Sequence, residues 1–299
     1  MAQPSNKIVR LGRLPKYLES YCIYSGTHLP RDARSKEHII PLSLGGNRLT
    51  TIFVSRELNS LFGSVIDGAI EKDPMISFGR RDTCSRGHSG SRSEPEWRNA
   101  VLWNPKTSLF SGEGNFTLRF PKGRPIALNN RTREIRDAAS AEHAFVIWNM
   151  KIDHVARLKF TLKTFLGIGW QLFREEFLEA VDTTCLRKIL RCSIQLVEGI
   201  GEGGISFTDG FIESTPAARE RDDKLARAIT RKGLTTVMIR QDGGQLNWST
   251  TCLGYFVGSV WLPQTQPLLA GDLANGDGLL FTFNNRGYSV ERVEKHRLL

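Results

Sequence analysis

A carboxylate and an imidazole stand side by side near the start of the chain. Glu37 and His38 lie in the segment SKEHIIPLSLGGN, residues 35–47, where an Ile-Ile-Pro run precedes two adjacent glycines. A glutamate can bind a hard divalent cation through oxygen, and a histidine can take a proton from water near neutral pH. The alternative is that both are ordinary surface residues at the end of a strand.

A third polar residue, Asn59, lies near the start of a segment with helical periodicity. Its amide oxygen could bind the same ion as Glu37, which leaves most of a Mg²⁺ shell to water and phosphate oxygens. A bound phosphodiester would then be polarised by the metal and attacked by water that His38 activates. The three residues predict phosphodiester hydrolysis with Glu37 and Asn59 as ligands of Mg²⁺ or Mn²⁺.

Short elements must position these residues. The runs YCIY and HIIPL are typical of strands, and Pro41 with Gly45-Gly46 ends the second run. From Arg56 onward, apolar residues recur at steps of three and four, which predicts an amphipathic helix. The apolar residues of this face are Leu58, Leu61, Phe62, Val65, Ile66, Ala69 and Ile70. The expected local order is hairpin, loop, helix.

The same letters carry a family resemblance. YCIYSG, SKEHIIPLSLGGN and RELNSLFGSVIDGAI, within about residues 20–76, resemble the HNH endonuclease family in its zinc-supported ββα-metal branch. The resemblance implies that Glu37 is the acidic metal ligand, His38 the general base and Asn59 the final metal-holding residue. It also implies that the substrate is nucleic acid, with DNA expected in preference to RNA. The role implied is defence or restriction, as in bacterial and phage proteins.

The zinc cysteines of that branch are mostly missing. Its first pair falls on Cys22 and Ser25 and its second on Ser55 and Leu58, which cannot form a tetrahedral thiolate site. We therefore expect no structural zinc and a finger held by packing. The residues expected to pack are Ile23, Ile40, Phe53, Leu58 and Phe62. The loss leaves a second hypothesis open, a decayed HNH module that binds nucleic acid or serves as a scaffold.

The net charge of +10 is unevenly placed. Residues 1–100 and 101–200 each hold 15 Lys+Arg against 10 Asp+Glu, whereas the remainder is balanced at 11 against 11. A localised basic excess is typical of proteins that meet phosphate backbones. The alternative is a basic protein without a polyanionic partner.

A basic segment without aliphatic residues, residues 79–96, follows the predicted helix. Its arginines could clamp phosphates through bidentate contacts, and a solvated loop is the alternative. Two further cationic residues, in or directly after the segment that contains the Glu-His pair, complete the set of predicted nucleic-acid contacts. These residues are Arg80, Arg81, Arg86, Lys36 and Arg48.

This loop is also the predicted domain boundary. We expect an HNH-like ββα-metal domain over residues 1–90 and an α+β domain over residues 91–299. The role expected for the second domain is target recognition or sensing.

In the second part we predict a hairpin around PKG and a long helix spanning Phe145 to Phe165. Further helices are predicted at residues 170–181 and 183–192 and from Thr215-Pro216. The runs TTVMIRQ, NWSTTCL, YFVGSVWL and GLLFTF predict an antiparallel sheet. The residues expected on the solvent face of the long helix are Lys151, Arg157, Lys159 and Lys163. The expected fold class is α+β.

The five cysteines are scattered and odd in number, which favours free thiols in a reducing compartment. No apolar run approaches the roughly 18 residues of a membrane span, and the first residues lack the core of a secretory signal. We therefore expect a cytoplasmic protein without a membrane partner. A homodimer would supply the two sites that a double-strand cut requires.

Overall fold

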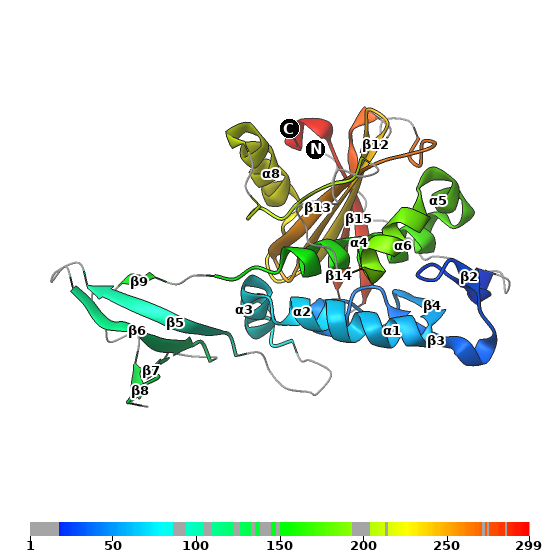
Figure 1. Ribbon diagram of the computed structural model, residues 1–299. Helices are drawn as coiled ribbons and strands as arrows, with labels where there is room; N and C mark the ends of the chain where they lie inside the picture. The colour runs from blue at the N-terminus through cyan, green and yellow to red at the C-terminus, as the bar shows by residue number, and fades with distance from the viewer. Residues whose placement is uncertain are drawn as a thin grey trace. The chain divides into compact units, whose positions relative to one another are not determined.

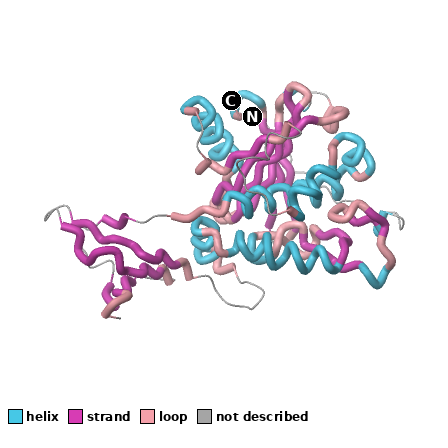
Figure 2. The backbone as a smooth tube through the Cα atoms, viewed as in Figure 1, coloured by secondary structure: helices cyan, strands magenta, loops and turns pink. Residues whose placement is uncertain are grey.

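The computed structural model shows helices and antiparallel sheets, which confirms the α+β class (Figure 1). It describes residues 18–85, 94–104, 109–121, 126–132, 135–137, 145–147, 150–192, 204–212, 215–270, 273, 275–284 and 286–298. Figure 2 shows the helices and strands along the backbone of these residues.

The chain divides into two compact units, the first of residues 1–71 together with 153–299, and the second of residues 72–152. This division differs from the boundary expected after residue 90. The physical reason is the long helix α4, His154–Phe173, which packs against residues 63–71 and places Lys163 against Glu37. A linker-like composition marked a loop, but it carried no sign of this long-range packing.

The N-terminal segment of the first unit holds two strand pairs followed by a helix. Strands β3 and β4 pair antiparallel, with Glu37 opposite Ile52 and His38 opposite Thr51. The helix predicted after Arg56 is confirmed, although a π-helical turn interrupts it. The bounds are β1 Tyr21–Cys22, β2 Thr27–His28, β3 Arg34–His38, β4 Thr51–Ser55, α1 Arg56–Phe62, η4 Gly63–Asp67 and α2 Gly68–Glu71. Short 3-10 turns are η1 Leu18–Ser20, η2 Arg31–Ala33 and η3 Leu42–Leu44.

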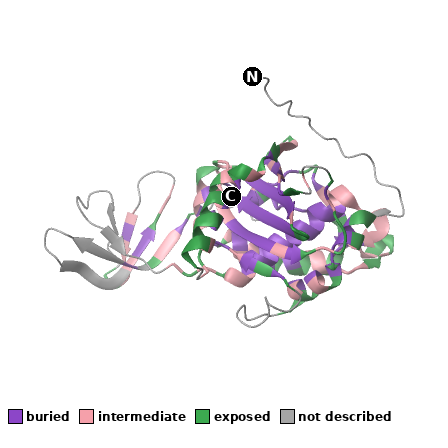
Figure 3. Ribbon diagram, turned by 90° about the horizontal axis from the view of Figure 1, so that it is seen from above, coloured by how far each residue is buried: buried purple, intermediate pink, exposed green. Residues whose placement is uncertain are grey.

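A six-stranded antiparallel sheet forms the centre of the first unit, in the order β10-β13-β12-β11-β14-β15. The strands predicted near its middle are confirmed, whereas β10 and β15 were not predicted. Its bounds are β10 Ser206–Thr208, β11 Thr235–Asp242, β12 Gln245–Cys252, β13 Tyr255–Pro263, β14 Gly278–Asn284 and β15 Gly287–Val293. Buried residues run through these strands, as Figure 3 shows.

Helix α4 is covered on more than one side. It contacts β12 and β13 of the sheet as well as η4, α2, α5 and α6, so every residue from Ala156 to Trp170 is buried. The prediction of a solvent face is therefore wrong for Arg157, Lys159 and Lys163, whereas Lys151 is exposed but precedes the helix. The helix also starts later than predicted, because Asp153 caps it through the Ala156 amide while Phe145–Ile147 forms strand β9.

Two of the other helices of the first unit, α6 and α8, begin at a side-chain cap. The helix predicted from Thr215-Pro216 is confirmed, with the Thr215 hydroxyl accepting from the Ala218 amide. Asp182 caps α6 in the same way. The bounds are α5 Glu175–Ala180, α6 Thr183–Arg191, α8 Pro216–Ile229 and η7 Lys295–Arg297.

The second unit consists of helix α3 and a five-stranded antiparallel sheet in the order β8-β7-β6-β5-β9. The predicted hairpin is confirmed, since Phe116 pairs with Asn129 and Arg119 with Ile126. A small aromatic cluster joins Phe78 of the helix to the sheet. The bounds are α3 Pro74–Asp82, β5 Glu96–Asn104, β6 Leu109–Arg119, β7 Ile126–Asn129, β8 Ile135–Asp137 and β9 Phe145–Ile147.

Candidate active site

Glu37 lies on β3 and is buried, because α4 packs over its face of the strand. Its Oε1 lies 2.6 Å from Nζ of Lys163. One helical turn further, a Cβ on Gly167 would stand 2.7 Å from Cγ2 of Ile39, so the helix closely approaches the strand there. Lys163 and Gly167 thus meet Glu37 of β3 and Ile39, which lies just beyond the end of that strand.

Asp67 completes a buried ionic cluster with Glu37 and Lys163. Nζ of Lys163 donates to Oδ2 of Asp67 at 2.6 Å, and the lysine side chain has no solvent exposure. Burial raises the pKa of Asp67 to about 6, against the lowering effect of the Lys163 charge. Burial lowers the pKa of Lys163, but the two carboxylates outweigh it and raise the pKa, so the lysine is charged.

Tyr24 lies close enough to this cluster to be affected by its charges. Burial raises the pKa of its phenol, and the charges of Glu37 and Asp67 raise it further. The Tyr24 hydroxyl and the Oδ1 of Asp67 are buried without a hydrogen-bond partner among the described residues. The sequence analysis selected neither Tyr24 nor Asp67 and placed Lys163 on a solvent face; an available signal was the apolar run of residues 165–170 that follows Lys163 closely on the same helix.

His38 ends strand β3 and is half-buried. Because successive residues of a strand point to opposite faces, its imidazole lies on the opposite side of β3 from the Glu37 carboxylate. The structure therefore keeps the predicted base and the predicted acidic ligand adjacent in the backbone, with side chains that diverge.

Asn59 lies on α1 and ties that helix to β3. Its Nδ2 donates to the Ser35 hydroxyl at 3.0 Å and to the Lys36 carbonyl at 3.3 Å. Ser35 shares the strand face of Glu37, so the structure brings Asn59 to the residues just before the predicted ligand. The strand lies earlier than the predicted run HIIPL, because β3 ends at His38 and Leu42–Leu44 forms a 3-10 turn. Ser55 sets the start of this helix, because its hydroxyl accepts from the Leu58 amide.

Cys22 takes part in the packing of the N-terminal segment through hydrogen bonds. Its sulfur accepts from the Ser25 amide at 3.3 Å and from the Ser55 amide at 3.1 Å. Among the residues expected to hold the finger by packing, Ile23, Ile40 and Phe62 are buried, as predicted. Leu58 is half-buried.

Phe53 does not join this core. It is 41% exposed because it lies opposite Lys36 on the outer face of the β3–β4 pair. The Arg34 guanidinium lies 5.9 Å from the centre of its ring. The prediction that Phe53 packs inside the finger is therefore wrong.

The donor types suit a hard divalent cation, but their arrangement does not. Within the described part of the chain, no group of three or more His, Cys, Asp or Glu side chains could hold a metal ion. Glu37 is already bound to an ammonium, so it is not free to act as a metal ligand while Lys163 stays in place. Glu37 and Asn59 could hold a cation only after that contact is broken.

The predicted nucleic-acid contacts differ in their surroundings. Lys36 and Arg48 are exposed, as a phosphate contact requires. Arg80 is buried, and Arg81 donates through Nε and Nη2 to Asp82. Arg86 lies outside the described residues.

A pocket beside β3 contains two basic residues that the sequence analysis did not select. Its lining includes Arg31 and Arg34 together with Phe53 and Glu19. The guanidinium of Arg34 donates to the Glu19 carbonyl at 2.7 Å, which fixes that side of the pocket. The two arginines of the RDARSK segment were the available sequence signal.

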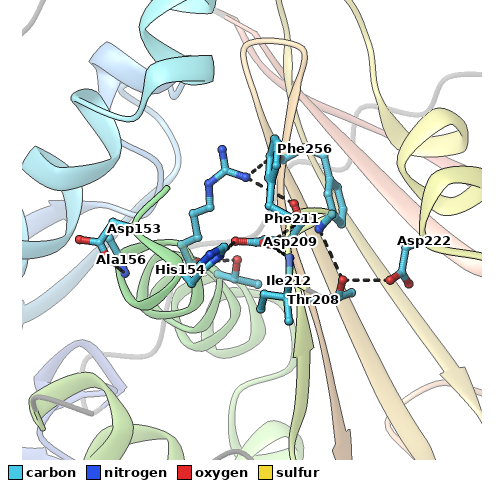
Figure 4. A network of polar contacts seen from close by, with 12 residues as sticks. Asp153, His154, Ala156, Thr208, Asp209, Phe211, Ile212, Asp222 and Phe256 are labelled. Carbon is cyan, nitrogen blue, oxygen red and sulfur yellow. Dashed lines mark hydrogen bonds and ion pairs between the residues drawn. The ribbon is translucent and has the colours of Figure 1, made fainter. Parts of the chain in front are cut away.

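A second polar network anchors the first turn of α4 to the loop after β10 (Figure 4). Nδ1 of His154 lies 2.6 Å from Oδ2 of Asp209, whose Oδ1 accepts from the Phe211 and Ile212 amides. The guanidinium of Arg157 donates to the carbonyls of Asp209 and Phe256, each at 3.4 Å. These contacts fix the helix that carries Lys163.

No protein-family model matches the chain, and no curated protein or solved structure matches it either. No helix in the described ranges is long and apolar enough to cross a membrane.

Proposed function

We propose that the chain is an HNH-type endonuclease that hydrolyses phosphodiester bonds of nucleic acid, DNA before RNA. The observation that carries the proposal is the succession of β3, β4 and α1, in which the helix residue Asn59 is bonded to the strand that bears Glu37 and His38. The sequence resemblance implies the same order of elements and the same three residues.

In this proposal, His38 takes a proton from the attacking water, a role that suits an imidazole at a half-exposed strand end. Lys36 and Arg48 contact phosphates beside it, because both are exposed and cationic. Mg²⁺ or Mn²⁺ would supply polarisation of the phosphate when bound. The metal is proposed from the donor types of Glu37 and Asn59 alone. The arrangement around Glu37 opposes it, because Lys163 occupies the carboxylate.

One observation favours a second function, a nucleic-acid-binding or scaffold protein that no longer cleaves. Glu37 is buried and paired with Lys163, and a carboxylate held by an ammonium is not available to a metal. Under this alternative, Lys36 and Arg48 still bind the phosphate backbone, while His38 has no reaction to catalyse.

Cleavage separates the two functions. Wild type, His38→Ala and the control His28→Ala are incubated with supercoiled plasmid, single-stranded DNA and RNA in Mg²⁺, Mn²⁺ or chelator. We expect nicking by wild type and His28→Ala, and a loss of about 10²-fold or more in His38→Ala, as for removal of a general base. His28 is an exposed histidine of the same segment, bonded to the Ser20 hydroxyl, which makes it a matched control. Binding of all substrates without nicking of any would instead establish the second function.

The proposal extends to the cell. We propose that the protein acts in the cytoplasm, in defence or restriction, where its five cysteines remain free thiols. We further propose that a homodimer brings two sites to a duplex for a double-strand cut.

A further inference from the structure

The pocket beside β3 combines two arginines with an aromatic ring. Its volume is about 480 Å³, within the range of small-molecule sites, and its lining includes Arg31, Arg34, Phe53 and Glu19. Phe53 is 41% exposed, so part of its ring is open to a ligand. Arginines bind phosphate through paired hydrogen bonds, and an aromatic ring stacks on a nucleobase. The lining therefore suits a ligand that has both groups, which is a nucleotide.

The cationic side of the pocket is held in place before any ligand binds. Nη1 of Arg34 donates to the Glu19 carbonyl at 2.7 Å, so this guanidinium loses little freedom when it binds a phosphate. Arg31 lies in the turn η2 and is exposed. The two guanidinium groups outweigh the single carboxylate of Glu19, so the described lining has a net positive charge that attracts an anion.

The strand pair β3–β4 connects this pocket to the proposed catalytic base. Phe53 lies directly opposite Lys36, and His38 lies opposite Thr51. Arg34, Lys36 and His38 are alternate residues of β3, so their side chains share its outer face. The distance from Arg34 to His38 is about 13 Å along an extended strand. One strand of nucleic acid can therefore place a phosphate at His38 and a nearby nucleotide in the pocket.

A base inside a regular duplex cannot make this contact. Both of its ring faces are covered by neighbouring bases, so a side chain can stack on it only where the base leaves the helical stack. Leaving the stack costs least for a base that is already unpaired. Phe53 therefore favours an unpaired nucleotide.

We propose that the pocket lined by Arg31, Arg34 and Phe53 binds one unpaired nucleotide of a DNA strand. The base lies against Phe53, and the phosphate lies on the two arginines. The substrate class is then DNA with an unpaired nucleotide close to the bond that is cut. The statement about cleavage rests on the proposed nuclease function, whereas binding in the pocket does not.

The test measures DNA binding to the full chain by fluorescence anisotropy in chelator, where metal-dependent cleavage does not occur. Three labelled duplexes with the same ends are compared: a perfect duplex, one with a bulged nucleotide, and one with an abasic residue in the bulge. The variants are Phe53→Ala and Arg31→Ala. Leu42→Ala is the control for Phe53, because Leu42 is a large apolar residue that is 43% exposed and is not among the described lining residues. Arg227→Ala, an exposed arginine of α8, is the control for Arg31.

We expect wild type to bind the bulged duplex about tenfold more tightly than the perfect duplex, as for stacking of one base on an aromatic ring. The abasic residue and Phe53→Ala should each abolish this preference. Arg31→Ala should reduce it about threefold, as for loss of an exposed ion pair, and both controls should retain it. Equal binding of the bulged and perfect duplexes by wild type, no binding of either, or an unchanged preference in Phe53→Ala would overturn the inference.

Two further measurements separate the inference from a site for free nucleotides and from the nuclease proposal. Displacement of the bulged duplex by less deoxyadenosine monophosphate than unlabelled duplex would assign the pocket to free nucleotides and overturn the inference. Cleavage of the same duplexes is assayed in Mg²⁺ or Mn²⁺. Preferential binding of the bulge without cleavage of any duplex would keep the pocket and remove the nuclease proposal. Equal binding and equal cleavage of the bulged and perfect duplexes would do the reverse.

Discussion

The ammonium of Lys163 shows how much one side chain can decide in this molecule. Breaking a buried ion pair by removing one partner typically costs about 3–5 kcal/mol, whereas replacing all partners by neutral groups costs far less. Lys163→Met should therefore lower the free energy of unfolding by about 3–5 kcal/mol in metal-free buffer. The triple variant Glu37→Gln/Asp67→Asn/Lys163→Met should recover most of that loss. Urea unfolding measures both, and a triple variant as unstable as the single one would contradict the expectation.

Asp222 supplies a pH-dependent contribution to stability. Burial raises its pKa, although the Thr208 hydroxyl, which donates to its Oδ2 at 2.9 Å, partly opposes this. The folded state then binds a proton more readily than the unfolded state, so the free energy of unfolding falls as pH rises from the ordinary value of 3.8 through the raised pKa. Asp222→Asn should flatten this decline, measured by urea unfolding as the pH is raised from the ordinary value of 3.8. The same slope in both proteins would show that Asp222 does not contribute.

For single residues, the sequence indicated which side chains belong to the candidate site, but it did not indicate which side chains they contact. Glu37, His38 and Asn59 could be selected because their types and order are legible in the chain. Lys163 could not, because nothing near it in sequence indicates that its partners are Glu37 and Asp67. A lysine at a helical position is ordinarily solvated, and burial becomes visible when distant elements are assembled.

Helix α4 packs closely against Ile39 at Gly167, a position without a side chain. At Gly167 a Cβ would meet Ile39 at 2.7 Å, whereas at Gly63, in η4, it would meet no atom within 4 Å. Gly167→Ala should destabilise the protein by about 1–3 kcal/mol through overpacking. Gly63→Ala should be neutral or stabilise by up to about 1 kcal/mol, because alanine favours a helix. Thermal unfolding of the two variants tests the pair, and equal melting temperatures would contradict the close approach.

Elements with local signals were predicted well, and elements fixed by distant contacts were not. Helix α8 was predicted from Thr215-Pro216, and the β6–β7 hairpin from the alternating residues around its turn. Apolar spacing that continues into α4 predicts a helix at Phe145–Ile147, where the structure has strand β9. Its pairing with β5 is a tertiary contact that periodicity does not contain.

For the whole molecule, the net charge of +10 predicts salt-sensitive binding to DNA. Each phosphate contact contributes about 0.9 to the slope of log affinity against log salt on duplex DNA. Lys36→Ala/Arg48→Ala should therefore reduce this slope by about 2. The control Lys232→Ala/Arg286→Ala removes the same charge from two exposed positions in the balanced part of the chain. Fluorescence anisotropy at several salt concentrations measures the slopes, and an equal reduction in both variants would exclude a specific role for Lys36 and Arg48.

The division into units shows which feature of the whole molecule was hardest to predict. Composition located a polar loop, but residues 1–71 pack with residues 153–299, while residues 72–152 form a unit of their own. Sequential assignment of domains assumes that neighbours in the chain fold together. Here the contacts of α4 with η4 and α2 decide the division.

That discontinuous first unit also sets an order of events during synthesis. A ribosome delivers Glu37 and Asp67 well before Lys163, and at about 5–20 residues per second the intervening stretch takes roughly 5–20 seconds to translate. Throughout that interval the two carboxylates lack their internal partner and are open to the ions of the cell. The nascent chain therefore passes through a stage in which its acidic pair is uncovered, and completion of α4 closes it.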